Sequence, residues 1–106
     1  MALAPGDRLE VFHSRSDNSE VIVCRGWLDE STCDHLQELI DVAVEDRVAR
    51  LRVDLRTLFG VDDAGMRCLL TTSERCQAYG IHLEIETNRP IRSALAAHGM
   101  AHLAHG

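Results

Sequence analysis

Residues 50–66 read RLRVDLRTLFGVDDAGM, and this stretch decides the fold. Apolar and polar residues alternate over 51–55, which predicts a strand with one buried face and one open face. Asp62 and Asp63 follow, and carboxylates stabilise the N-terminus of a helix because the partial charge there is positive. We therefore expect a strand that leads into a helix at these two aspartates.

An N-terminal hairpin is predicted upstream of this stretch. Residues 9–14 and 20–25 form two short runs rich in Val, Ile and Phe, and residues 15–19 between them contain the turn formers Ser, Asp and Asn. Gly26 ends the second run. The two runs are expected to pair as antiparallel strands.

A first helix is expected directly after the hairpin. Ser31 and Asp34 resemble a capping box, with Asp in place of the usual Glu or Gln. Apolar residues then recur at helical spacing, while acidic residues fall on the opposite side. The apolar positions are Cys33, Leu36, Leu39, Ile40, Ala43 and Val44.

Two further helices and a fourth strand follow the central stretch. The helix after the aspartates should run to Gly80, residues 81–86 alternate as a strand, and Pro90 opens a third helix that ends before Gly99. Residues 100–106 are expected to fray. The buried stripe of the second helix is predicted to contain Met66, Leu69, Leu70, Ser73 and Cys76.

The order of these elements predicts the fold class. A strand that follows a crossover helix pairs parallel to the strand before it, with right-handed connections. Residues 1–106 should form one α/β domain, with a four-stranded mixed sheet, an N-terminal β-hairpin and helices packed on one face. A chain of 106 residues with 45% apolar content suits one such domain.

Charge and hydropathy exclude several classes of function. A net charge of −6 argues against nucleic acid, since phosphate binding needs clustered positive charge. No apolar stretch approaches the ~20 residues of a membrane span, and the opening MALAPGDR lacks the pattern of a signal peptide. We expect a cytoplasmic protein that contacts neither nucleic acid nor membrane.

Three segments together resemble one family. Residues 26–29 (GWLD), with Thr32 beyond them, are similar to a G-x-L-D segment, and residues 51–55 (LRVDL) are similar to a third strand. Residues 61–66 (VDDAGM) stand where that family has an aliphatic residue and then D-S-S-G-L. These segments resemble the STAS domains of sulphate transporters and anti-sigma factor antagonists, and the match covers nearly the whole chain.

The resemblance implies a function through protein binding. In the family, the first Ser of D-S-S-G is phosphorylated by a partner that is both an anti-sigma factor and an ATPase-fold serine kinase. The unphosphorylated antagonist binds that partner and so frees the sigma factor. Here Asp63 and Ala64 replace both serines, so this phosphorylation site is lost.

The replacement by Asp63 leaves two interpretations open. Phosphoserine carries about −1.5 to −2 charge and three acceptor oxygens, whereas a carboxylate carries −1 and two. Asp63 therefore either mimics the off state or leaves a permanent binder. A partner pocket that expects a neutral hydroxyl would reject the carboxylate, and one that offers an Arg would accept it.

The predicted contact surface combines the aspartates with their neighbours. It consists of Asp29, Asp63, Ala64, Gly65 and Met66, with Asp62 shaping the turn. Asp29 joins the set because both strand-to-helix turns are expected at the same end of the sheet. Its alternative role is a local turn or cap. We expect no catalytic residue, metal or cofactor, and the common phosphate-binding, esterase and zinc-protease motifs are absent from the sequence.

Two alternative functions remain. One is a STAS subunit of a transport ATPase or of a stressosome-like signalling complex. The other is a small-ligand or redox sensor that uses the open sheet face or the thiols. The cysteines have no CxxC spacing, which favours buried thiols; they are Cys24, Cys33, Cys68 and Cys76.

Three other groups have competing interpretations. Trp27 is either a partly exposed anchor for a partner or a residue buried against the sheet edge. The histidines of the C-terminal region, His98, His102 and His105, suggest a metal but lack an accompanying ligand, which favours a solvated tail. Thr71, Thr72 and Ser73 are candidate phosphorylation sites, although ordinary helix residues are favoured there.

Overall fold

The sheet begins with an antiparallel hairpin of β1 (Leu9–Ser16) and β2 (Ser19–Leu28) in the computed structural model, which describes residues 9–105. The turn is shorter than predicted, because only residues 17 and 18 separate the strands. Asp17 takes a left-handed backbone conformation there, with φ 54°. Asp tolerates this conformation better than most residues, so a tight turn is possible.

Two long central strands extend the sheet. β3 (Arg50–Val61) pairs parallel to β2, and β4 (His82–Glu86) pairs parallel to β3. Both β2 and β3 run further than the sequence pattern predicts. The register shifts where they pass Gly26, whose φ of 117° is readily adopted by glycine, and β2 then continues to Leu28.

The predicted four strands are present, and the tail adds a fifth short one. The sheet order is β1-β2-β3-β4-β5, in which β5 (Ala104–His105) pairs parallel to β4 after the 3₁₀ turn η2 (Ala101–Leu103). Two hydrogen-bonded residues carry no hydrophobic period, so the sequence pattern could not reveal this strand. The expectation of a frayed tail is wrong for residues 101–105.

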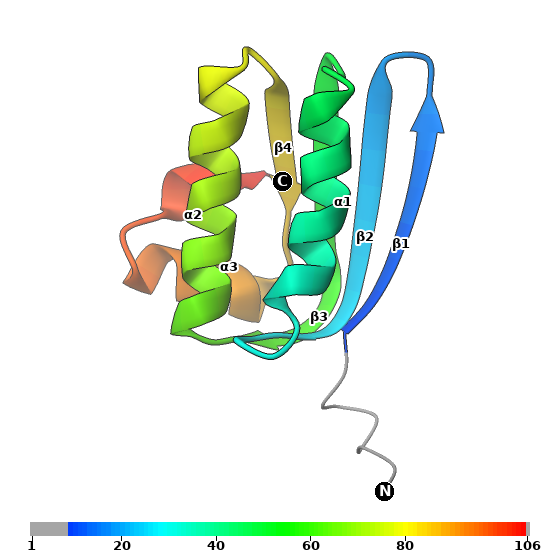
Figure 1. The fold of residues 1–106 in the computed structure, drawn as a ribbon. Coiled ribbons are helices and arrows are strands. Elements are labelled where there is room, and N and C mark those ends of the chain that lie inside the picture. Colours follow the sequence, from blue (N-terminus) through cyan, green and yellow to red (C-terminus); the bar gives the residue numbers. More distant parts are fainter. Residues whose placement is uncertain (1–8, 106) are drawn as a thin grey trace, which may run out of the picture.

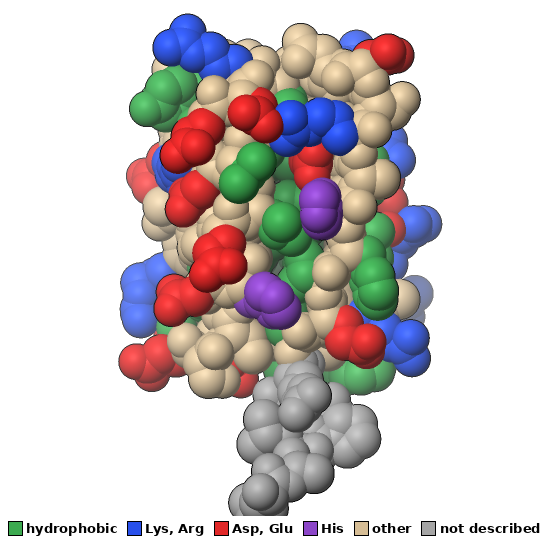
Figure 2. All heavy atoms as spheres, turned by 45° about the vertical axis from the view of Figure 1, so that its right-hand side comes forward, with side chains coloured by type: hydrophobic (Ala, Val, Ile, Leu, Met, Phe, Trp, Pro, Cys, Tyr) green, Lys and Arg blue, Asp and Glu red, His purple; other side chains and the backbone are tan. Residues whose placement is uncertain are grey.

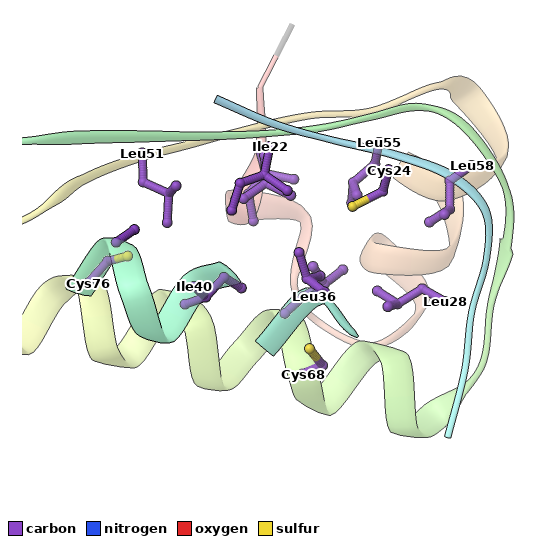
Figure 3. Close-up of a cluster of buried hydrophobic side chains, with 14 of the residues drawn as sticks. Ile22, Cys24, Leu28, Leu36, Ile40, Leu51, Leu55, Leu58, Cys68 and Cys76 are labelled. Carbon is purple, nitrogen blue, oxygen red and sulfur yellow. The ribbon is translucent and has the colours of Figure 1, made fainter. Parts of the chain in front are cut away.

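Three helices cover one face of the sheet, as predicted. They are α1 (Cys33–Glu45), α2 (Asp63–Ala78) and α3 (Arg89–Ala97). Figure 1 shows α1 and α2 side by side across the sheet. Figure 3 shows Ile22, Leu51 and Leu55 pointing from the strands towards Leu36 and Ile40 on the helix side, where the dry aliphatic core lies.

The helix starts and stripes differ from prediction in detail. The predicted capping box of Ser31 and Asp34 does not form. Thr32 is the N-cap residue and its side chain makes no capping bond, while the hydroxyl and the backbone N–H of Ser31 both donate to the carboxylate of Asp29. On α2 the stripe turns slightly: Thr72 is fully buried, whereas Leu70 is exposed and Ser73 half-buried. The hydroxyl of Thr72 donates to the carbonyl of Cys68, which satisfies it inside the core.

Candidate protein-binding site at the start of α2

Asp62 caps α2 and joins two loops. Its Oδ1 accepts a hydrogen bond from the backbone N–H of Gly65 at 2.8 Å, and its Oδ2 accepts one from the backbone N–H of Glu30 at 3.3 Å. Its own N–H donates to the carbonyl of Leu28 at 3.1 Å. The loop after β2 and the start of α2 are therefore held together by one residue. The prediction that at least one of the two aspartates caps this helix is confirmed for Asp62.

Gly65 permits the close approach of α2 to the end of β2. A Cβ at this position would lie 2.4 Å from the carbonyl oxygen of Leu28 and 2.6 Å from Cγ2 of Val61. Both distances are far below van der Waals contact, and one of the neighbours is backbone, which cannot move aside easily. Only glycine fits the first turn of this helix as it is packed.

Asp29 organises its own loop. Its Oδ1 accepts hydrogen bonds from the backbone N–H groups of Ser31 and Thr32 and from the hydroxyl of Ser31, at 2.7 to 3.1 Å. The hydroxyl of Thr32 lies 3.1 Å from the same oxygen and 2.7 Å from the carbonyl oxygen of Trp27, to which it donates. These bonds, led by that from the Ser31 hydroxyl, hold the pKa of the Asp29 carboxyl below its ordinary value.

Asp63 is a strongly exposed carboxylate of the site. It is the first residue of α2, and 82% of its side chain is accessible. Its Oδ1 lies 3.7 Å from Nε2 of His98, the residue that caps the end of α3. Unlike Asp62 and Asp29, whose oxygens are used inside the loops, Asp63 presents its charge to solvent.

A shallow hollow lies beside Asp63. Met66 and Met100 are buried at 3% and 7% exposure, Leu70 is 38% exposed, and Arg67 and His98 complete the lining. Leu70, backed by the two buried methionines, offers an apolar surface next to the exposed carboxylate of Asp63. This combination suits a protein contact with one apolar and one basic group.

The predicted site residues divide into two groups. Asp62, Gly65 and the backbone of Ala64 build the turn, and the thiol of Cys33 donates to the carbonyl of Ala64 at 3.5 Å. Asp63 and Met66 face the hollow. The structure joins the loop of Asp29 to the start of α2 through Asp62, as the shared sheet end predicts. The expected role of all six residues as a contact surface stays a prediction.

His98 was missed as a neighbour of this site. The sequence places it at the end of the third helix and, with His102 and His105, in a candidate metal group, but not beside Asp63. It lies 35 positions after Asp63, and no spacing rule connects the end of one helix with the start of another. The packing of α3 against β3 brings it there.

A family model described as "Mlab, STAS domain" matches residues 11–105. The chain belongs to the STAS domain family. No curated protein sequence matches it. Its STAS domain is similar in fold to the anti-sigma factor antagonist SpoIIAA in its unphosphorylated form, with a TM-score of 0.78 and 16% identity over 91% of this chain and 86% of that chain.

Two other solved structures share the fold. An anti-sigma factor antagonist from Mycobacterium paratuberculosis has a TM-score of 0.82 and 21% identity, over 92% of this chain and 84% of that chain. A sulfate transporter family protein from Wolinella succinogenes has a TM-score of 0.72 and 22% identity, over 80% of this chain and 70% of that chain. The predicted resemblance to the STAS family and its α/β fold are thereby confirmed.

The four cysteines of the STAS domain are free thiols: Cys24, Cys68 and Cys76 are buried, and Cys33 is half-buried. Burial raises the pKa of Cys24 and of Cys33 to about 12, and it also raises the pKa of Cys68 and Cys76. A thiol that stays protonated at neutral pH is a poor nucleophile and a poor metal ligand. These environments argue against the redox sensor.

The remaining alternatives find little support in the geometry. Among the side chains that the structure describes, no group of three His, Cys, Asp or Glu residues is placed to hold a metal; the side chain of His105 lies outside that part of the chain. Thr72 is buried and inaccessible to a kinase, while Thr71 is exposed. None of the described helices is both long and apolar enough to cross a membrane.

Proposed function

We propose that this STAS domain is an anti-sigma factor antagonist that binds an anti-sigma factor of the ATPase-fold serine kinase type and so releases a sigma factor. The start of α2 is the contact surface in this proposal. The observation that carries it is the exposure of Asp63 on a turn fixed by Asp62 and Gly65. A turn held by these contacts, with an exposed carboxylate on it, is organised for recognition by another molecule.

The charge of Asp63 selects the chemistry of the partner. Family resemblance gives this position to a serine that is free when the antagonist binds. A carboxylate buried against an apolar or acidic pocket would cost several kcal/mol, so a neutral-hydroxyl pocket would exclude it. We propose a dedicated partner that offers an Arg or Lys opposite Asp63 and an apolar side chain to the hollow of Met66, Leu70 and Met100.

Such a binder would be independent of the phosphorylation switch. Asp63 has no hydroxyl to modify, and Ala64 beside it has none either. The amount of protein, instead of its phosphorylation state, would then set how much anti-sigma factor is sequestered. The alternative, in which Asp63 imitates phosphoserine and abolishes binding, predicts the opposite result in the following experiment.

An affinity pull-down from the source cell's lysate tests this proposal. The baits are the wild type, Asp63→Ser, Asp63→Lys and the control Glu74→Lys, which reverses an exposed charge further along the same helix. We expect an anti-sigma factor, identified by mass spectrometry, to be retained by wild type and control and lost with Asp63→Lys. Retention by Asp63→Ser alone would identify a built-in off state, and retention by all four baits would refute the site.

A second function has one observation in its favour. The similarity to a sulfate transporter family protein shows that the same fold occurs in a transporter family. A role as a subunit of a transport ATPase or of a stressosome-like complex would place other proteins in the pull-down. Recovery of transport ATPase subunits in place of an anti-sigma factor would favour that function.

A further inference from the structure

Aromatic residues avoid the core of this domain. The chain has two Phe, one Trp and one Tyr, and all four are exposed: Phe12 by 54%, Trp27 by 40%, Phe59 by 61% and Tyr79 by 60%. The buried core consists of aliphatic residues, methionine and cysteine. Exposed Trp, Tyr and Phe are the residues most enriched in protein interfaces.

An apolar band runs along the sheet face that the helices leave open. Ile22, Cys24 and Leu28 are fully buried on the helix side, and strand alternation places Val21, Val23 and Trp27 on the other side of β2. On β1 the same alternation places Phe12 there, and Phe12 is the direct partner of Val23. We call Phe12, Val21, Val23 and Trp27 the apolar band.

The indole ring of Trp27 occupies the space that a side chain at Gly60, its partner on β3, would otherwise fill. A Cβ at Gly60 would lie 2.1 Å from the indole ring. The ring therefore rests against the backbone of β3 while 40% of the residue remains accessible. An aromatic group that is already ordered loses little entropy when a partner covers it.

The rest of the open face carries equal numbers of positive and negative side chains. Arg52 pairs with Glu84 at 3.4 Å, and Arg56 pairs with Glu86 at 3.2 Å and with Asp54 at 2.7 Å. By alternation the face carries four arginines and four acidic residues; these are Arg25, Arg50, Arg52 and Arg56, with Glu10, Asp54, Glu84 and Glu86. The net charge of −6 therefore lies on the other surfaces.

Acidic side chains are concentrated on the helix side. Figure 2 shows them gathered over α1 beside the groove that this helix forms with β1. They include Asp34, Glu38, Asp41 and Glu45. Two copies that approached through this side would repel each other, whereas two neutral open faces would not.

We propose that the open sheet face is the interface of a symmetric homodimer. The sheet spans the broad face of the molecule, whose two longer extents are 38 and 32 Å, and a standard interface needs only about 800 Å² from each partner. In a two-fold arrangement, the apolar band of one copy covers that of the other, with the sheets packed face to face about 10 Å apart. α2 and Asp63 lie on the opposite layer and stay free.

Sedimentation velocity over concentrations from about 1 µM to about 1 mM tests the dimer, with the fluorescence of the single tryptophan as a second readout. We expect the 11.8 kDa chain to double its mass and the Trp27 emission to shift to shorter wavelength as the dimer forms. Phe12→Asp and Arg25→Glu, which attack the apolar band and the charge balance separately, should each weaken dimerisation by about tenfold or more. Tyr79→Asp, an exposed aromatic residue at the end of α2, is the matched control and should not.

Three results would overturn this inference. The wild type could remain monomeric over the whole range. The dimer could persist unchanged in both interface variants while their circular dichroism matches that of the wild type, which would place it elsewhere. Finally, Tyr79→Asp could weaken it as much as Phe12→Asp, which would show a nonspecific effect of the added charge.

Discussion

Asp62 and Glu30 are 32 positions apart, yet the carboxylate of Asp62 accepts the backbone N–H of Glu30 while it caps its own helix at Gly65. The side chain thus satisfies one donor in the loop after β2 and one in the first turn of α2. This bond couples the loop after β2 to the start of α2, which are two of the three places where the sequence resembles the STAS family. The exposed Asp63 takes its position from that coupled framework.

Removing the carboxylate of Asp62 should destabilise the domain. Asp62→Ala leaves the N–H groups of Gly65 and Glu30 without this acceptor, and the loss of an N-cap costs about 1 kcal/mol, with a range of roughly 0.5–2. Urea unfolding of the variant measures the change. Asp62→Asn is the control, because it keeps an acceptor oxygen and is an equally good cap; a loss as large as that of Ala would contradict this role.

A methyl group at position 65 should be poorly tolerated. Gly65→Ala places a Cβ against the carbonyl of Leu28 and Cγ2 of Val61, and relief of such overpacking typically costs about 1–3 kcal/mol. Helix propensity alone would instead favour Ala over Gly by about 1 kcal/mol. The sign of the change in unfolding free energy, measured in urea, therefore decides whether packing or propensity dominates, and stabilisation would refute the close approach.

Acid should weaken the domain through Asp54. Hydrogen bonds from Arg56 hold the pKa of Asp54 below its ordinary value of 3.8. As the pH falls, the unfolded chain binds this proton before the folded one does, so the stabilising contribution is complete above 3.8 and is lost as the pH falls through the lower folded pKa. Urea unfolding from about pH 6 to about pH 3 should show a shallower acid loss in Asp54→Asn than in wild type.

Asp29 has a lowered pKa for a similar reason, so Asp54→Asn should reduce the acid dependence without abolishing it. The variant Asp29→Asn should have an effect in the same direction. If the unfolding free energy fell equally with acid in the wild type and in both variants, the hydrogen bonds to Asp54 and to Asp29 would not persist in solution.

The thiols should be protected in the native state. Cys24 is fully buried and its pKa is raised to about 12, so it carries almost no thiolate at neutral pH. Iodoacetamide should leave Cys24 unmodified in native protein and label it in urea, as peptide mass spectrometry would show. Rapid labelling of native Cys24 would contradict the packed core and restore the redox hypothesis.

The sequence predicted the order of the elements because each carries a clear local signal. Apolar and polar residues alternate along β3, and two acidic residues mark the start of α2. It could not predict β5, whose two residues are too few to show a period. It placed Ser73 in the core where Thr72 lies, because a small rotation of α2 decides between neighbouring positions. The bond from Asp62 to Glu30 and the approach of His98 to Asp63 depend on tertiary packing, which no local pattern records.

The measurement that tests the central proposal most directly is the affinity of the purified domain for the anti-sigma factor recovered in the pull-down. Titration calorimetry would compare the wild type with Asp63→Lys and with the control Glu74→Lys. We predict that Asp63→Lys weakens binding by about 100-fold or more, because it places a cation against a cation, while the control stays within about threefold of wild type. Equal affinity of all three proteins would contradict the role of Asp63 and place the binding surface elsewhere.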